Sequence, residues 1–340
     1  MKDPVIIGSA PSSGSTLLRV ILSRHPSIAS GGEVALFDKR GLLQESPESY
    51  RASIGTWVEC GYPAEYLGPS EELFEELGEY PWDRTGLRDM CLSMPDYPAM
   101  LETFYSRNVS HRGAQRWLDK CPSNIYCFDL IAKLYPHARF IHIVRDARDS
   151  VVSYCRRGAT AFRAVSRWYF ANLNGVQYSA WPNYLRVRYE DLVSNPESVV
   201  RTICDFLDEP YLETLVNPAE AANAPRHTGW RYSERGPVRN DIARQVAREM
   251  TDGQRAMFTH VQLSLYGAQR LSRLSSPREL QQLLGYPIEG MEETPSLSAA
   301  ELRHALEDFE RYRTSILLRH GTRIECPVML SGLAAATAGK

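Results

Sequence analysis

The chain has 340 residues, of which 43% are hydrophobic and 24% are charged, a composition typical of a globular protein. This length allows one large α/β domain or two small domains, and either can bury a substantial core. The formal net charge is −2, whereas general nucleic-acid binders carry a basic excess. We therefore expect no nucleic-acid partner, and any positively charged site must be local.

The cysteine pattern and the hydropathy of the sequence indicate in which cellular compartment the protein resides. The seven cysteines are scattered without a Cys-x-x-Cys pair, which argues against a zinc ribbon or a disulfide framework and favours free thiols. The apolar run that begins at Val5 is too short for a signal-peptide core. No run approaches the roughly 18 apolar residues of a membrane span. These features predict a cytoplasmic protein without a membrane partner.

The first predicted elements are a strand, a loop of small residues and a helix. Residues 5–8 are apolar, residues 9–16 are rich in serine, and residues 17–23 predict a helix that ends before Pro26. Such a unit opens many α/β nucleotide-binding folds. Residues 38–118 lack a long regular period, and we expect helical insertions and loops there.

Strands and helices alternate again from Trp117 onward. The predicted elements are a helix at 125–135, a strand at 139–144, a helix up to Arg156, a strand at 185–189 and a helix at 196–207. This alternation is typical of a parallel sheet. The expected fold class is α/β, with a P-loop-like central parallel sheet flanked by helices.

The last third of the sequence is less regular. Residues 223–241 form a basic, loop-like segment, residues 242–266 and 277–284 have helical patterns, and residues 300–318 carry an apolar helical stripe. Packing of that stripe on the domain is favoured over a dimer contact, and the oligomeric state stays open.

The segment from Gly8 to Thr16 has the residues of a phosphate-binding loop. Gly14 lacks a Cβ atom, so a phosphate can approach its backbone closely. The amides that follow lie at a predicted helix N-terminus, where unpaired N–H groups and the helix dipole attract anions. Ser13 and Ser15 add hydroxyl donors. The segment predicts a phosphate or phosphosulfate site, and the alternative is an ordinary glycine–serine turn.

This loop departs from the nucleoside-triphosphate pattern, which has four residues between its glycines and then a lysine. Here five residues separate Gly8 from Gly14, and Ser15 stands where the lysine would be. A kinase is therefore disfavoured. An unusual small-molecule P-loop kinase that needs ATP and magnesium is kept as an alternative.

Two motifs resemble those of the sulfotransferases that use 3′-phosphoadenosine 5′-phosphosulfate (PAPS). The family's first loop reads Pro-Lys/Arg-Ser-Gly-Thr/Ser-Thr, and residues 11–16 match it at five of six places. Its second motif is an Arg at a strand end followed eight residues later by a Ser, like Arg145 and Ser153. The resemblance implies that the first motif grips the 5′-phosphosulfate and the second binds the 3′-phosphate. The implied residues of the first motif are Ser12, Ser13, Gly14, Ser15 and Thr16.

The chemistry of the second motif agrees, because an arginine at a strand end can make a bidentate contact with phosphate. For the motif alone, an ion pair between Arg145 and Asp146 is the alternative. Tyr189 resembles the family's tyrosine near the adenine. Arg235 and Gly236 resemble, weakly, its late basic loop over the 3′-phosphate, and a solvated turn is an equal alternative.

The resemblance also suggests catalytic residues. The tyrosylprotein-sulfotransferase-like branch has a glutamate base after a glycine and a lysine in an Asn-Lys-Asp-Pro segment. Glu33 follows two glycines, and Lys120 lies in Asp-Lys-Cys-Pro, so the resemblance implies that Glu33 is the base and that Lys120 contacts the sulfuryl oxygens. The alternatives are a helix-start or surface carboxylate for the glutamate and a surface lysine for the lysine. Ser12 departs from the family, which usually has a Lys or Arg there that helps to stabilise the leaving phosphate.

The expected function is therefore transfer of a sulfuryl group from PAPS to a hydroxyl of a small-molecule or tyrosine-like acceptor, with no metal, since the histidines show no ligand spacing. Aromatic residues of the 38–118 region suit an aromatic acceptor or a lid core: Trp57, Tyr62, Tyr66 and Trp82. A nucleotide-binding protein without turnover is a further alternative. We assign residues 1–290 to the sulfotransferase-like domain and residues 291–340 to a C-terminal helical extension and tail.

Overall fold

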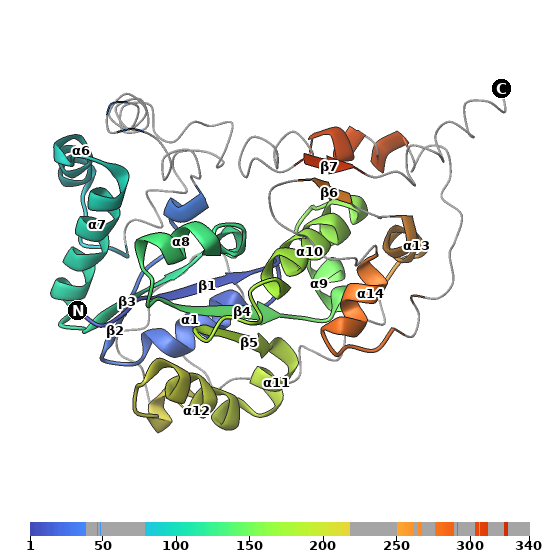
Figure 1. Ribbon diagram of the computed structural model, residues 1–340. Helices are drawn as coiled ribbons and strands as arrows, with labels where there is room; N and C mark the ends of the chain where they lie inside the picture. The colour runs from blue at the N-terminus through green and yellow to red at the C-terminus, as the bar shows by residue number, and fades with distance from the viewer. Residues whose placement is uncertain are drawn as a thin grey trace.

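The computed structural model describes part of the chain, namely residues 1–38, 46, 48, 79–217, 250–260, 264–266, 276–288, 291, 303–305, 307–311 and 323–325. At its centre lies a five-stranded sheet in the order β2-β3-β1-β4-β5, in which all paired strands are parallel (Figure 1). The strands are β1 (Val5–Ser9), β2 (Ile28–Ser30), β3 (Arg116–Lys120), β4 (Arg139–Val144) and β5 (Tyr184–Arg188). The expected α/β class with a central parallel sheet is confirmed.

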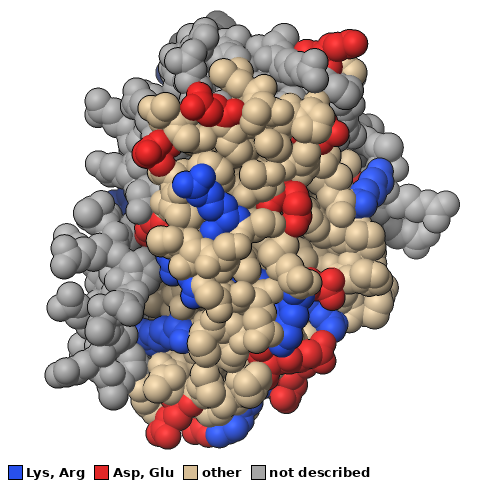
Figure 2. Space-filling model, turned by 90° about the vertical axis from the view of Figure 1, so that its left-hand side faces the viewer, with Lys and Arg blue, Asp and Glu red and all other residues tan. Residues whose placement is uncertain are grey.

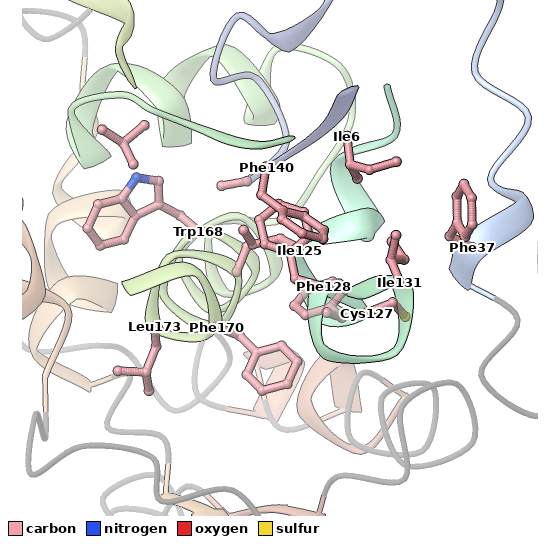
Figure 3. Packing of buried hydrophobic residues seen from close by; sticks show 14 of the residues in the cluster. Ile6, Phe37, Ile125, Cys127, Phe128, Ile131, Phe140, Trp168, Phe170 and Leu173 are labelled. Carbon is pink, nitrogen blue, oxygen red and sulfur yellow. The ribbon is translucent and has the colours of Figure 1, made fainter. Parts of the chain in front are cut away.

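Helices cover both faces of this sheet. Successive side chains of a strand point to opposite faces, so Val5 and Ile7 of β1 join one buried cluster and Ile6 joins the other. The first cluster is closed by α1 (Ser15–Ser23) and α12 (Pro196–Leu207). The second is closed by α8 (Phe128–Leu134) and α10 (Ala161–Val176), as Figures 1 and 3 show.

Two core helices were not identified from the sequence. Helix α10 was not predicted, although most of its residues are buried, and Figure 3 shows Trp168 and Phe170 packed in the same cluster as Phe128 of α8. Helix α7 (Tyr97–Arg112) lies in the region expected to be an insertion, yet it packs against β2 and β3.

Several predicted boundaries were wrong. Helix α1 begins at Ser15 rather than at residue 17, and Tyr189 opens α11 (Tyr189–Ser194) instead of ending a strand. The helix expected at 125–135 is a 3₁₀ turn, η2 (Pro122–Tyr126), followed by α8. The short strand β2 was not predicted, because three residues carry no periodic signal.

The C-terminal part also corrects the sequence analysis. The end of the helix expected at 242–266 is a strand, β6 (Ser264–Tyr266), which pairs antiparallel with β7 (Arg323–Glu325) of the C-terminal extension. Residues 303–305 and 307–311 of that extension are helical, as expected. Strands this short depend on a distant partner, which local patterns do not reveal. Phe309 of the predicted stripe is buried in the main core, so packing on the domain is confirmed for this residue.

The remaining elements complete the described part of the fold. They are η1 (Leu36–Asp38), α6 (Arg84–Ser93), α9 (Ala147–Cys155), η3 (Glu213–Leu215), α13 (Asp252–His260) and α14 (Pro277–Leu283). Within the residues that the structure describes, no helix has both the length and the apolar character needed to cross a membrane. On the face drawn in Figure 2, acidic and basic side chains of the described residues are interspersed.

Candidate functional site

The carboxyl ends of the five parallel strands meet at one edge of the sheet, where open α/β sheets bind their ligands. Each strand brings a singled-out residue to this edge. In the spatial order of the strands, these are Glu33 after β2, Lys120 at the end of β3, the loop at 10–14 after β1, Arg145 after β4 and Tyr189 after β5. Residues spread over more than half of the chain therefore line one edge.

The loop between β1 and α1 has the backbone of an anion cradle. Gly14 caps α1 with a φ of 89°, in the left-handed region that favours glycine. A Cβ atom added there would lie 2.3 Å from Cδ2 of Tyr189, so only glycine fits. Ser13 is fully buried, and its hydroxyl has no hydrogen-bond partner. The start of α1 thus presents amides and an unsatisfied hydroxyl at the edge.

Arg145 is the most informative side chain of the edge. It is 3% exposed, its Nη1 donates to the carbonyl of Ser12 at 3.1 Å, and its guanidinium carbon lies 4.5 Å from the ring centre of Tyr189. Its Nε and Nη2 atoms are buried without a hydrogen-bond partner. Unsatisfied buried donors are costly, and two of them on one guanidinium suit a bidentate anion.

The alternative of a strand-end ion pair between Arg145 and Asp146 is wrong. The carboxylate of Asp146 accepts from the backbone N–H of Arg148 at 2.9 Å, which caps α9, and pairs with the guanidinium of Arg148 at 2.6 Å. Arg145 instead forms an ion pair with Asp149, in which Nη2 lies 4.0 Å from a carboxylate oxygen without a hydrogen bond. Burial raises the pKa of Asp149 to about 6, while the charge of Arg145 acts to lower it.

One side of α9 faces the loop and holds residues that the sequence analysis missed. The hydroxyl of Ser150 donates to the carbonyl of Pro11 at 2.9 Å, and Nη2 of Arg157, just beyond α9, donates to the hydroxyl of Ser12. Half-buried Ser153 lies three residues after Ser150, so these two share a face of α9, and Arg157 follows Ser153 by four residues, just past the end of the helix. The spacings of three and four residues from Ser153 are the sequence feature from which Ser150 and Arg157 could have been predicted.

Lys120 and Glu33 meet at the other end of the edge. The Lys120 ammonium group forms an ion pair with the Glu33 carboxylate and lies 3.3 Å from the hydroxyl of Thr16 on α1. The lysine side chain is 2% exposed, so the surface-lysine alternative is wrong, whereas the glutamate side chain is 33% exposed. A buried ammonium and a partly open carboxylate therefore stand beside the phosphate-type loop.

A network of buried hydrogen bonds holds the carboxyl end of β3 in place. Asp119 accepts from the hydroxyl of Tyr105 and from Nδ2 of Asn124, each at 2.7 Å. The same amide nitrogen donates to the carbonyl of Ile7 in β1 at 3.2 Å. Burial raises the pKa of the Asp119 carboxyl above its usual value. These bonds tie the strand that carries Lys120 to the strand that leads into the loop.

His142 is packed inside the sheet, away from the edge. It is fully buried in β4, 2.8 Å from the hydroxyl of Tyr184 and 3.1 Å from Oδ1 of Asn172 on α10. Burial lowers the pKa of this imidazole to about 3, so the ring is neutral in the folded protein near pH 7.

Some expected residues lie outside the described part of the chain. They are Trp57, Tyr62, Tyr66, Arg235 and Gly236. Trp82 is described, and its ring stacks on Phe104 with the centres 6.1 Å apart, which places it beside the core. In the described ranges, no cluster of three or more His, Cys, Asp or Glu residues could hold a metal ion.

Sequence comparison shows which known proteins this chain is similar to. Residues 4–213 match the model of a family described as the sulfotransferase family. Protein-tyrosine sulfotransferase 1 of Danio rerio is 27% identical over 227 residues, covering 64% of this chain and 56% of that protein. The Drosophila melanogaster protein-tyrosine sulfotransferase is 24% identical over 65% of this chain and 41% of its own length. The chain thus spans about half the length of these relatives.

Solved structures support the fold. The sulfotransferase domain from the Synechococcus PCC 7002 olefin synthase superposes with a TM-score of 0.54 at 24% identity, over 84% of this chain and 97% of that domain. The sulfotransferase domain from the curacin biosynthetic pathway superposes with a TM-score of 0.56 at 19% identity, over 87% of this chain and 99% of that domain. The likeness to both is one of architecture.

Proposed function

We propose that this chain, which belongs to the sulfotransferase family, transfers a sulfuryl group from PAPS to a hydroxyl group of a tyrosine-like or small-molecule acceptor. The observation that carries the proposal is the order of groups along the sheet edge. An anion-binding loop lies at the centre, a buried arginine with unused donors lies on one side, and a Lys–Glu pair lies on the other. A donor with two phosphate positions and one reacting end matches that order.

The residues over β1, β4 and β5 fit the nucleotide end of the donor. The amides at the start of α1 suit the 5′-phosphosulfate, and the unused Nε and Nη2 of Arg145 suit the 3′-phosphate, with Ser153 on the same side of α9. Tyr189 offers a ring beside Arg145 for the adenine. Arg157, which contacts Ser12, brings positive charge to the position where the family usually has Lys or Arg.

The residues over β2 and β3 fit the transfer itself. The acceptor oxygen forms a bond to sulfur while the bond from sulfur to the 5′-phosphate oxygen breaks, which yields a sulfate ester and 3′-phosphoadenosine 5′-phosphate. Glu33 takes the proton of the acceptor hydroxyl. Lys120 donates hydrogen bonds to the sulfuryl oxygens and balances their charge. Its contact with Thr16 keeps it beside the loop that holds the leaving phosphate.

The acceptor class is supported by the partly open carboxylate and by the relatives. Glu33 is one-third exposed while Lys120 is buried, so a hydroxyl can reach the proposed base from solvent. The two relatives described above are named protein-tyrosine sulfotransferases. A phenolic hydroxyl, in a peptide or in a small molecule, is therefore the first acceptor to test.

Calorimetric binding of 3′-phosphoadenosine 5′-phosphate tests the donor, with AMP and with ATP plus magnesium as controls. We expect tight binding that requires the 3′-phosphate and is lost in Arg145→Ala. Arg139→Ala is the matched control, because Arg139 begins the same strand and pairs with Asp208 away from the edge. Stronger binding of ATP with magnesium would favour a kinase. Transfer from PAPS to p-nitrophenol and to a tyrosine peptide then tests turnover.

A further inference from the structure

The loop at 31–33, which carries Glu33, is held from two sides by buried side chains. Arg19 of α1 is 1% exposed, and its Nη1 donates to the carbonyl of Gly31 at 2.7 Å. Tyr80 is 6% exposed, and its hydroxyl donates to the carbonyl of Gly32 at 3.1 Å. Consecutive carbonyls of one short loop are thus bound by side chains from different parts of the chain.

The packing around Gly31 is as specific as the hydrogen bonds. A Cβ atom added to Gly31 would lie 2.3 Å from Cζ of Tyr80, so the tyrosine ring occupies the space that any larger residue would need. The same Nη1 of Arg19 pairs with the carboxylate of Glu79 at 2.8 Å. Glu79 and Tyr80 are adjacent, so arginine, ring and loop form one connected unit.

Helix α1 connects this unit to the donor site. Thr16 and Arg19 are three residues apart on α1, which puts them on the same side of the helix. Thr16 contacts the ammonium group of Lys120, and Arg19 holds the loop that carries Glu33. The first turn of the same helix follows Gly14 and its phosphate-type loop. Helix α1 therefore fixes the distances between the phosphate-type loop, Lys120 and Glu33.

We propose that Arg19 and Tyr80 are positioning residues that fix the Glu33 backbone at the distance from the donor loop that proton transfer requires. The inference rests on the proposed function, in which Glu33 takes the acceptor proton. A base that is displaced by about 1 Å can lose on the order of 100-fold in rate. A buried arginine that pairs with a backbone carbonyl and a carboxylate is costly to build, and here it restrains one loop.

Tyr80→Phe is the first test, because it deletes only the hydroxyl. We expect kcat to fall about 10- to 100-fold with p-nitrophenol. The KM for PAPS and the affinity for 3′-phosphoadenosine 5′-phosphate should change less than about twofold. Tyr97→Phe is the matched control, since its buried hydroxyl donates to the carbonyl of Leu36 at 2.5 Å, beyond the loop. Equal kcat values in the two variants would overturn the proposal, as would loss of nucleotide affinity in Tyr80→Phe alone.

Hydrogen exchange gives a readout that needs no turnover. In Tyr80→Phe the amides of residues 31–34 should exchange faster than in wild type and in Tyr97→Phe, while those of residues 12–16 stay unchanged. Unchanged exchange at 31–34 would overturn the positioning role. If the wild type binds the nucleotide but transfers no sulfuryl group, the proposed function fails, and exchange still reports on the restraint.

A double variant tests the packing. Gly31→Ala should lower kcat strongly in the wild-type background, because the new methyl group meets the Tyr80 ring. In a Tyr80→Ala background the methyl group has room, so Gly31→Ala should cost much less there. Equal losses of kcat in the two backgrounds would contradict direct contact as the cause.

Discussion

Lys120 and Glu33 form an ion pair although 87 residues separate them in the chain. The contact exists because β2 and β3 are neighbours in the sheet and run parallel, so the residues at their carboxyl ends meet. Thr16, from the helix after β1, touches the same ammonium group. Three neighbouring strands therefore assemble the part of the edge where we propose that transfer takes place.

Replacement of Lys120 by methionine should separate chemistry from nucleotide binding. Lys120→Met keeps the length and apolar stem of a buried side chain and removes the charge, so the fold should persist. We expect kcat to fall about 100- to 1,000-fold, the usual effect of losing one donor to a transition-state charge. Steady-state kinetics and calorimetry with 3′-phosphoadenosine 5′-phosphate check this. Unchanged kcat would exclude the proposed role.

Gly14→Ala should damage both the fold and the donor site. The φ of 89° strains any residue with a Cβ atom, and that atom would collide with Tyr189. Gly113→Ala is the matched control, because Gly113 has a φ of 63° but open space around it. We expect Gly113→Ala to cost about 1 kcal/mol of stability, and Gly14→Ala to cost more and to abolish nucleotide binding. Denaturant titrations and calorimetry make the comparison, and similar losses in both variants would contradict it.

Asp149 should make the protein more stable as the pH falls from about 6 toward 4. Its pKa is about 6 in the folded state against an ordinary value of 3.8, so the folded state binds the proton more tightly. The contribution is full below the unfolded pKa and is lost as the pH rises through 6. It is on the order of 2 to 3 kcal/mol. Asp149→Asn should remove this dependence in unfolding titrations at pH 4.5 and 7.5, and an unchanged slope would refute the assignment.

His142 should act in the opposite direction. Its pKa is about 3 in the folded state against an ordinary value of 6.5, so the unfolded state binds the proton more tightly. Stability from this residue is full above pH 6.5 and is lost as the pH falls toward 3. His142→Gln keeps a donor and an acceptor for Tyr184 and Asn172. The free energy of unfolding of the variant should fall less steeply than that of wild type between pH 6.5 and 4.5, and parallel curves would count against a neutral buried ring.

Most residues of the edge that we propose for the donor could be singled out from the sequence. The loop at 11–16 is contiguous, and Arg145 and Ser153 belong to one strand–helix unit, so short motifs carry the signal. Ser150 and Arg157 were not predicted, because their contacts depend on which side of α9 packs against the loop at 11–16. That side became clear only once β1 and β4 were paired as neighbours.

The sequence by itself determined the α/β class, the phosphate-type loop and the identity of Glu33 and Lys120 as residues of interest, because each follows from local pattern or a short motif. The tertiary structure alone decided the order of the strands, and with it which residues meet. It made Arg145 a buried cation with unused donors and paired Lys120 with Glu33. It also brought Arg19 and Tyr80 to one loop. The physical reason is that contacts between distant residues depend on strand order and helix packing, which local sequence patterns do not encode.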